Sequence, residues 1–232
     1  MIPKKIHYCW FGKGEKSKLA VKCINSWRKY CPDYEIIEWN EDNFDVTINA
    51  YTEMCYKEKK YAYLSDYVRL LIIAEHGGVY FDTDVELVKS LNELLGNDAF
   101  LGFENEKYVA TGLGFGSVPH GITVEAMLAE YDPLLNGVNG TIGCPKLNTK
   151  ALVELGLVQN GLKQKVCDAV IYPTSFFNPY DSATGKLNKT NETISIHWYA
   201  ATWMSKRQKI RRMITKPLHR IFGVDAFKRF RK

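Results

Sequence analysis

The sequence predicts an α/β fold with a single domain built on a mainly parallel central sheet. In the first half of the chain, short apolar runs alternate with segments of helical hydrophobic periodicity, which is the pattern of a parallel sheet covered by helices. A length of 232 residues suits one such domain with a substantial core. Since no linker interrupts the body, we expect one domain at 1–205 and a separate tail at 206–232.

The elements of the first half follow from their hydrophobic periods. The helix expected at 61–75 ends at Gly77 and Gly78, because paired glycines are a common C-terminal stop. The apolar strand after it opens directly onto Asp82. The expected elements, in order, are a strand at 5–11, a helix at 19–30, a strand at 34–39, helices at 49–58 and 61–75, and a strand at 79–81.

The second half is read in the same way, with a surface loop in its Gly- and Asn-rich stretch at 136–143. The expected elements are strands at 99–103, 113–117, 169–172 and 193–198, and helices at 123–130 and 149–155.

Composition indicates a soluble globular protein, with 46% hydrophobic and 25% charged residues. No run approaches the ~18 apolar residues of a membrane span, and the N-terminal residues lack the pattern of a signal peptide. We therefore expect a cytoplasmic protein. Its six cysteines contain no C-x-x-C pair, which favours reduced thiols.

Asp82 and Asp84 form a D-x-D motif at the end of the expected strand. Because strand side chains alternate, both carboxylates are expected on one face, with Thr83 facing away. Two converging carboxylates favour a hard cation such as Mg²⁺ or Mn²⁺, and strand carboxyl ends are where open α/β sheets bind ligands. A solvated turn is the other interpretation of two such acids.

Asp66 and Arg69 lie three residues apart in the preceding helix and hence on one face. They could form a surface ion pair. However, the helix continues into the apolar run 70–74, which indicates burial, and a buried charge needs a partner or a purpose. A forked guanidinium beside a metal suits a diphosphate.

Four blocks in this order resemble the glycosyltransferases with a sugar-binding D-x-D region, a family 32-like group. That group includes capsular and other polysaccharide enzymes and, more distantly, the clostridial glucosylating toxins. The resemblance implies the GT-A fold, which is the Rossmann-like fold that binds nucleotide sugars. The blocks are IPKKIHYCWFG at 2–12, YLSDYVRLLIIAEHGGVYFDTDVEL at 63–87, TIGCPKLNT at 141–149 and IHWYAATW at 196–203.

The resemblance also implies roles for individual residues. Asp66 and Arg69 would hold the donor sugar and its phosphates, while Trp10 would stack on the base and Tyr80 would line the same pocket. A buried core position is the alternative for Trp10.

For the metal, Mn²⁺ or Mg²⁺, the resemblance implies that Asp84 is a direct ligand, that His197 is another, and that Asp82 contacts the ribose or the metal through water. Thr202 and Trp203 would close over the diphosphate. An ordinary strand histidine and a core or tail-packing tryptophan are the alternatives for His197 and Trp203.

The function implied is transfer of a hexose, with retention, from a nucleotide diphosphate sugar. Uridine is the preferred base and guanosine the next. Asp66 is expected nearest the reacting sugar as a binder of its hydroxyls, and no nucleophile is assigned. Two rivals stay open: a haloacid dehalogenase-type phosphatase, whose motif also begins with a strand and D-x-D, and a non-catalytic nucleotide-sugar-binding protein. Glu86 departs from the phosphatase motif.

The tail is strongly basic, with eleven Lys and Arg residues and one acid, Asp225, between Lys206 and Lys232. Its apolar residues recur at spacings of three and four, as in a basic amphipathic segment that docks on anionic lipid. We expect Pro217 to interrupt this segment. We expect peripheral association with the inner face of the plasma membrane, and a glycan or lipid-linked acceptor in bacterial surface polysaccharide synthesis. Nucleic acid is not an expected partner, because stacking aromatics are sparse there.

Overall fold

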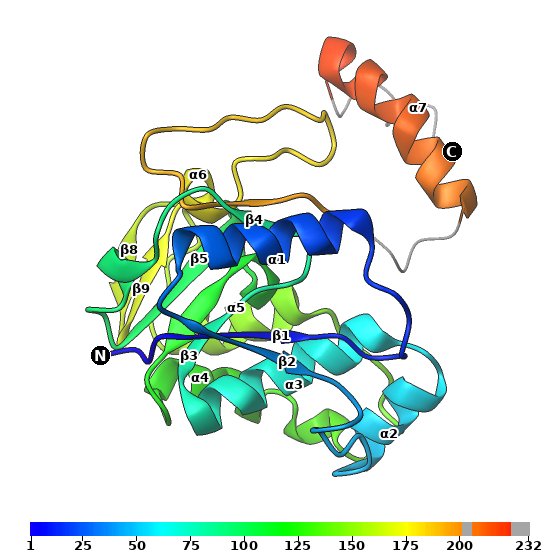
Figure 1. Ribbon diagram of the computed structural model, residues 1–232, viewed down its shortest axis with the longest axis vertical. Coiled ribbons are helices and arrows are strands. Elements are labelled where there is room, and N and C mark those ends of the chain that lie inside the picture. The colour runs from blue at the N-terminus through cyan, green and yellow to red at the C-terminus, as the bar shows by residue number, and fades with distance from the viewer. Residues whose placement is uncertain (201–205, 224–232) are drawn as a thin grey trace.

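A mixed sheet in the order β2–β1–β3–β7–β5–β9–β8 forms the centre of the protein. The computed structural model describes residues 1–200 and 206–223, and Figure 1 shows helices on both faces of the sheet. The strands are β1 (Lys5–Cys9), β2 (Glu35–Trp39), β3 (Gly78–Tyr80), β5 (Ala99–Asn105), β6 (Tyr108–Val109, paired with β5), β7 (Phe115–Ser117), β8 (Gln164–Val166) and β9 (Ala169–Tyr172).

A second, two-stranded sheet pairs β4 (Val85–Leu87) with β10 (Ser195–His197). The helices are α1 (Lys18–Tyr30), α2 (Ala50–Lys57), α3 (Tyr61–His76), α4 (Ile122–Ala129), α5 (Cys144–Glu154), α6 (Thr174–Phe177) and α7 (Lys206–Phe222). Single 3-10 turns occupy Asn92–Leu94, Thr111–Leu113 and Asp132–Leu134.

The prediction of a mainly parallel sheet is confirmed, with β7 reversed inside it and β6 and β8 reversed beside β5 and β9. The strands β2, β1 and β3 pair in parallel, as do β5 and β9. Between these groups, β7 is antiparallel to both β3 and β5. Since two antiparallel pairings restore the direction, β3 and β5 point the same way, and their carboxyl ends lie on one side of the sheet.

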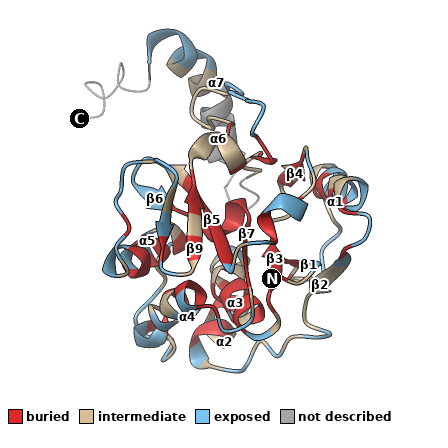
Figure 2. Ribbon diagram, turned by 90° about the vertical axis from the view of Figure 1, so that its left-hand side faces the viewer, coloured by how far each residue is buried: buried red, intermediate tan, exposed pale blue. Residues whose placement is uncertain are grey.

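Alternating side chains divide the core into two clusters, one on each face of the sheet. On one face, Ile6 and Tyr8 of β1 pack with α1, and the Tyr8 ring meets the ring of buried Trp27 at 5.5 Å between centroids. On the other face, Cys9 packs in a cluster with Val68 of α3. Figure 2 shows buried residues concentrated along the central strands and α3.

The D-x-D motif lies in a turn rather than in a strand, which corrects the expected alternation. Strand β3 ends at Tyr80, and the turn that leads into β4 is closed by the Val85 amide, which donates to the Asp82 carbonyl at 3.0 Å. The two carboxylates therefore converge because the chain turns between them. Thr83 does not face away, because it lines the same cavity as both acids.

Two helices also differ from expectation. Helix α5 begins at Cys144 instead of 149, with Pro145 in its first turn, where proline's missing N–H costs no helical hydrogen bond. Helix α7 continues through Pro217 instead of breaking there.

All six cysteines are free, as the sequence predicted. Among the described residues, no helix is both long and apolar enough to cross a membrane.

A buried histidine in β1 ties three elements together. His7 is fully buried, its Nε2 contacts the Gly77 carbonyl at 3.1 Å, and its Nδ1 accepts from Trp39 Nε1 at 3.0 Å. This pairing suits the neutral ring with its proton on Nε2. Burial lowers the pKa of His7 to about 4 from its usual 6.5.

We predict that His7 makes the protein less stable as the pH falls. Between pH 6.5 and about 4 the unfolded chain binds a proton on His7 that the folded chain does not. The free energy of unfolding therefore decreases as the pH is lowered, and His7 accounts for up to about 3 kcal/mol of that decrease. His7→Gln should remove this component. Urea unfolding of both proteins from pH 7 to 4 would show it, and equal pH slopes would contradict the prediction.

Candidate active site

A cavity of about 770 Å³ opens at the carboxyl ends of β1 and β3. This is the edge at which open α/β sheets bind ligands. Trp10 follows β1 directly and lines the cavity, as do Tyr80 and both acids of the D-x-D motif. Asp66 of α3 and His197 of β10 complete the predicted residues found there. Elements far apart in the sequence therefore meet around one space.

Arg69 lies behind this cavity, fully buried, and does not line it. Its guanidinium forms an ion pair with Asp66 one turn earlier and donates to Asp82 Oδ1 at 2.9 Å and to Cys144 Sγ at 3.1 Å. The alternative of a surface ion pair is excluded by this burial. A buried cation between two carboxylates fixes both, because moving either would leave the charge uncompensated.

Asp82 is held from several sides. Its Oδ1 accepts from the Tyr80 hydroxyl at 3.2 Å as well as from Arg69. Burial raises the pKa of Asp82, and the charge of Arg69 opposes the shift. Its Oδ2 lies against Gly112, where a Cβ would come within 2.2 Å of it. Only glycine fits Gly112 with Asp82 in this position.

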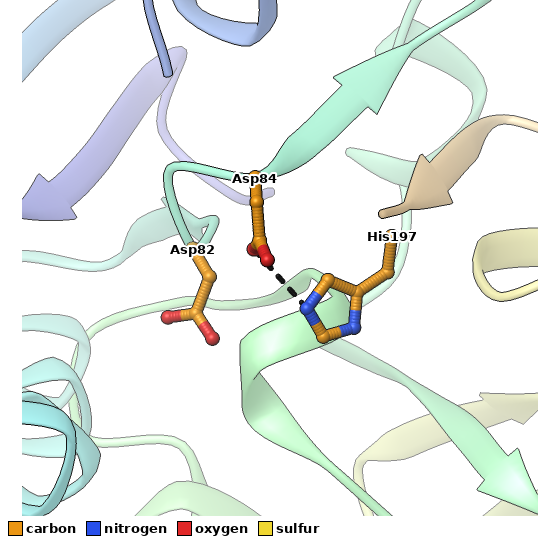
Figure 3. Close-up of side chains that lie close together, drawn as sticks. All are labelled: Asp82, Asp84 and His197. Carbon is orange, nitrogen blue, oxygen red and sulfur yellow. Dashed lines mark ion pairs between the residues drawn. The ribbon is translucent and has the colours of Figure 1, made fainter. Parts of the chain in front are cut away.

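Asp84 is paired with His197 by the small β4–β10 sheet. The register sets His197 opposite Val85, next to Asp84, and the Nε2–Oδ1 distance is 3.1 Å (Figure 3). The other carboxylate oxygen accepts from the Ala200 amide at 2.7 Å. Burial alone would raise the pKa of Asp84, but His197 holds it below its ordinary value.

Asp82, Asp84 and His197 fit the coordination chemistry of a divalent cation. One ligand atom from each lies within 4.8 Å of the others. Two carboxylate oxygens suit Mg²⁺ or Mn²⁺, and an imidazole favours Mn²⁺ over Mg²⁺. The buried Nδ1 atom of His197 has no hydrogen-bond partner in the described part of the chain, while its Nε2 faces Asp84.

The remaining predicted residues differ in what the structure says of them. Trp10 is half-buried, its Nε1 donates to the Gly14 carbonyl at 2.7 Å, and the Lys16 ammonium lies 5.5 Å from its ring. It is therefore a wall of the cavity and not a core residue. Thr202 and Trp203 lie outside the described residues.

Sequence reasoning missed several residues of the site. Gly112 and Cys144 were not singled out, although Cys144 belongs to one of the recognised blocks. Glu104 and Tyr199 line the cavity too, and Tyr199 lies in the recognised block at 196–203. A glycine or a glutamate outside a motif carries no local signal of such a position, because only packing brings it there.

Comparison with known proteins agrees with this geometry. Residues 17–101 match the family described as "Glycosyltransferase sugar-binding region containing DXD motif". This part of the chain is similar to the sugar-binding region of that glycosyltransferase family. The resemblance expected from the sequence is thus confirmed, and the matched segment contains Asp66, Arg69 and the D-x-D motif.

A relative and a solved structure extend the comparison. Over 102 residues the chain is 29% identical to inositol phosphoceramide mannosyltransferase 3 of Schizosaccharomyces pombe (strain 972 / ATCC 24843). The aligned stretch covers 40% of this chain and 27% of that protein. The structure of PaToxG glycosyltransferase superimposes with a TM-score of 0.54 at 19% identity, over 66% of this chain and 68% of that one. This likeness confirms the GT-A-type fold.

Gly112→Ala tests whether glycine is needed to seat Asp82. The added methyl group must displace the Asp82 carboxylate, and such overpacking costs about 1–3 kcal/mol. We expect a lower melting temperature and weaker Mn²⁺ binding by titration calorimetry. Gly96→Ala is the matched control, because nothing lies within 4 Å of its Cβ position. Equal Mn²⁺ affinity in both variants would contradict the role given to Gly112.

Proposed function

We propose that this chain is a metal-dependent, retaining glycosyltransferase that moves a hexose from a nucleotide diphosphate sugar, with uridine as the preferred base, to a glycan or lipid-linked acceptor. The observation that carries the proposal is the grouping of Asp82, Asp84 and His197 in a cavity with Trp10 on its wall. Both the glycosyltransferase family match and the GT-A-type fold support it.

The cavity offers separate places for the parts of such a donor. The indole of Trp10 provides a flat surface for the base, with Lys16 near it. Asp66, which lines the same cavity, is the carboxylate for the hydroxyls of the sugar. One of its oxygens is paired with Arg69 and the other accepts from the Cys144 amide at 3.4 Å. This pairing orients Asp66 before the donor binds.

Asp82, Asp84 and His197 would hold Mn²⁺ or Mg²⁺, which supplies positive charge against the diphosphate as it leaves. Arg69 is buried behind these residues and does not line the cavity. Because its donors point at Asp66, Asp82 and Cys144, it positions carboxylates instead of contacting the phosphates directly. Lysine could not replace it, since a single ammonium lacks the planar fork that serves several acceptors at once.

Titration of the purified protein with nucleotide diphosphate sugars tests this function. We expect one donor to bind with Mn²⁺ and not with a chelator. Asp84→Asn should weaken binding by at least about a hundredfold, since even residues that only support metal ligands contribute about 10–100-fold. Asp98→Asn is the control, because Asp98 is exposed and does not line this cavity.

Each result of this titration decides between functions. Failure of every donor to bind, combined with hydrolysis of a phosphate ester, would replace the proposal with the phosphatase alternative. Donor binding without turnover would leave a nucleotide-sugar-binding protein.

The second part of the proposal concerns the tail, which we assign to anionic lipid on the inner face of the plasma membrane. Helix α7 stands beside the body in Figure 1. Its Ile221 and Phe222 are 73% and 61% exposed, and Arg211 and Arg220 are exposed as well. Exposed apolar and basic side chains on one helix match an interfacial anchor.

Vesicle sedimentation with anionic phospholipid tests the tail. Replacing Arg211 and Arg220 together by Gln removes about 2 kcal/mol of attraction, since each basic residue near the surface contributes about 1 kcal/mol. We therefore expect about 30-fold weaker binding. The control replaces Arg28 and Lys29, exposed on α1, by Gln. Equal losses in the two double variants would show that only net charge matters and would contradict docking through α7.

A further inference from the structure

A second cavity, of about 550 Å³, adjoins the one described above. Its volume is within the ~300–1,000 Å³ usual for small-ligand sites. Glu104, Ser182 and Tyr199 line both cavities and so form the wall between them. A group bound in the second cavity would reach the first across these three side chains.

The wall is tied to the candidate metal site and held in place. The Tyr199 ring packs on His197 at 4.0 Å between centroids, and its hydroxyl lies 3.4 Å from Glu104 Oε1. Asn178 donates to that hydroxyl at 2.7 Å and to the Glu104 carbonyl at 2.9 Å. Tyr199 has a φ of 51°, a left-handed conformation that is unfavourable for a tyrosine and persists only where the surrounding structure enforces it.

The lining has a distinct chemistry. It contains three carboxylates, Glu104, Glu106 and Asp181, and among the described residues that line it there is no Lys, Arg or His. Buried Asn178 also lines it, and its Oδ1 has no hydrogen-bond partner in the described part of the chain. These groups accept hydrogen bonds and repel anions. They suit hydroxyl or ammonium donors on a ligand.

A positively charged side chain, Lys216, lies just outside this cavity. Lys216 of α7 donates to the Tyr180 hydroxyl at 2.9 Å, and its Nζ lies 5.2 Å from the centre of that ring. Tyr180 lines the cavity and Lys216 does not. Any anionic part of a ligand would thus lie outside, towards α7.

We propose that the second cavity binds the acceptor as an uncharged or amino sugar, and that Glu104 accepts a hydrogen bond from the hydroxyl that is glycosylated. This inference rests on the proposed glycosyltransferase function and names its acceptor class. In the transfer, the anomeric carbon loses its bond to the phosphate oxygen and gains one to the acceptor oxygen. The electron pair and the acceptor proton leave with the nucleoside diphosphate. Glu104 orients the hydroxyl and forms no bond to the sugar.

The test measures transfer to methyl glycosides of hexoses, hexosamines and uronic acids by the full chain with Mn²⁺ and the donor found by titration. Asn188→Trp places a large side chain at an exposed residue of the second cavity, and Asn191→Trp, exposed in the same loop, lies outside it. We expect Asn188→Trp to lower kcat/KM for the acceptor by at least about tenfold, as blocked pockets do. Asn191→Trp should match the unchanged protein.

Acceptor charge gives a second, independent readout. Neutral and amino glycosides should be used at least about tenfold better than uronic acids, a difference of ~1.4 kcal/mol. In Glu104→Gln this preference should shrink. In Glu106→Gln, at a carboxylate that lines the second cavity and not the first, it should also shrink while donor affinity, titrated without acceptor, is retained. That pattern would not follow from a merely structural role of these carboxylates.

The outcomes separate this inference from the function on which it rests. Normal transfer by Asn188→Trp, or equal use of uronic acids by the unchanged protein, overturns the acceptor cavity alone. Absence of donor binding in the unchanged protein overturns the glycosyltransferase function and the acceptor cavity together. Transfer to no neutral or amino glycoside, with donor binding intact, again overturns only the cavity.

Discussion

The buried guanidinium of Arg69 is the constraint on which the site depends. A charge in the core must be compensated locally, and here the compensation comes from Asp66 on the same helix and from Asp82 in the turn after β3. Because one cation holds both acids, α3 and the D-x-D turn cannot move independently. The contact with Cys144 extends the same restraint to the start of α5. The acids at the cavity surface are thus held by a contact from behind.

The other half of the site is held by backbone pairing. Strand β10 pairs with β4, although the two strands are far apart in the sequence. The register of this pairing brings His197 beside Asp84. The amides of Trp198 and Ala200 then donate to the Asp84 carbonyl and carboxylate at 3.0 and 2.7 Å. The Asp82 carboxylate is thus held by the side chains of Arg69 and Tyr80, whereas the Asp84 carboxylate is held by the His197 ring and a backbone amide. The two acids of this short motif are therefore held in place by different parts of the fold.

Charge is distributed over the two cavities in a way that fits two different ligands. The first cavity combines candidate cation ligands with Trp10 and Lys59 in its lining, which suits a nucleoside diphosphate. The second is lined by carboxylates and amides, which suit neutral hydroxyls. The described basic residues of α7 line neither cavity. Such a gradient orients a substrate that carries its own charge at one end only.

The sequence by itself determined the alternation of elements, the helix stop at Gly77 and the D-x-D motif, because local periods and short motifs record them. The GT-A-type fold followed from the resemblance of four ordered blocks to a known family. The sequence also brought Asp66 and Arg69 onto one helical face, since three residues make nearly a turn. Only the tertiary structure decided that Arg69 is buried behind the cavity, that β7 runs against its neighbours and that Gly112 must be glycine. These depend on atoms brought together from distant positions, and so does the wall formed by Glu104, Asn178 and Tyr199. A local pattern cannot report a contact whose partner lies about a hundred residues away, such as Tyr199 with Glu104.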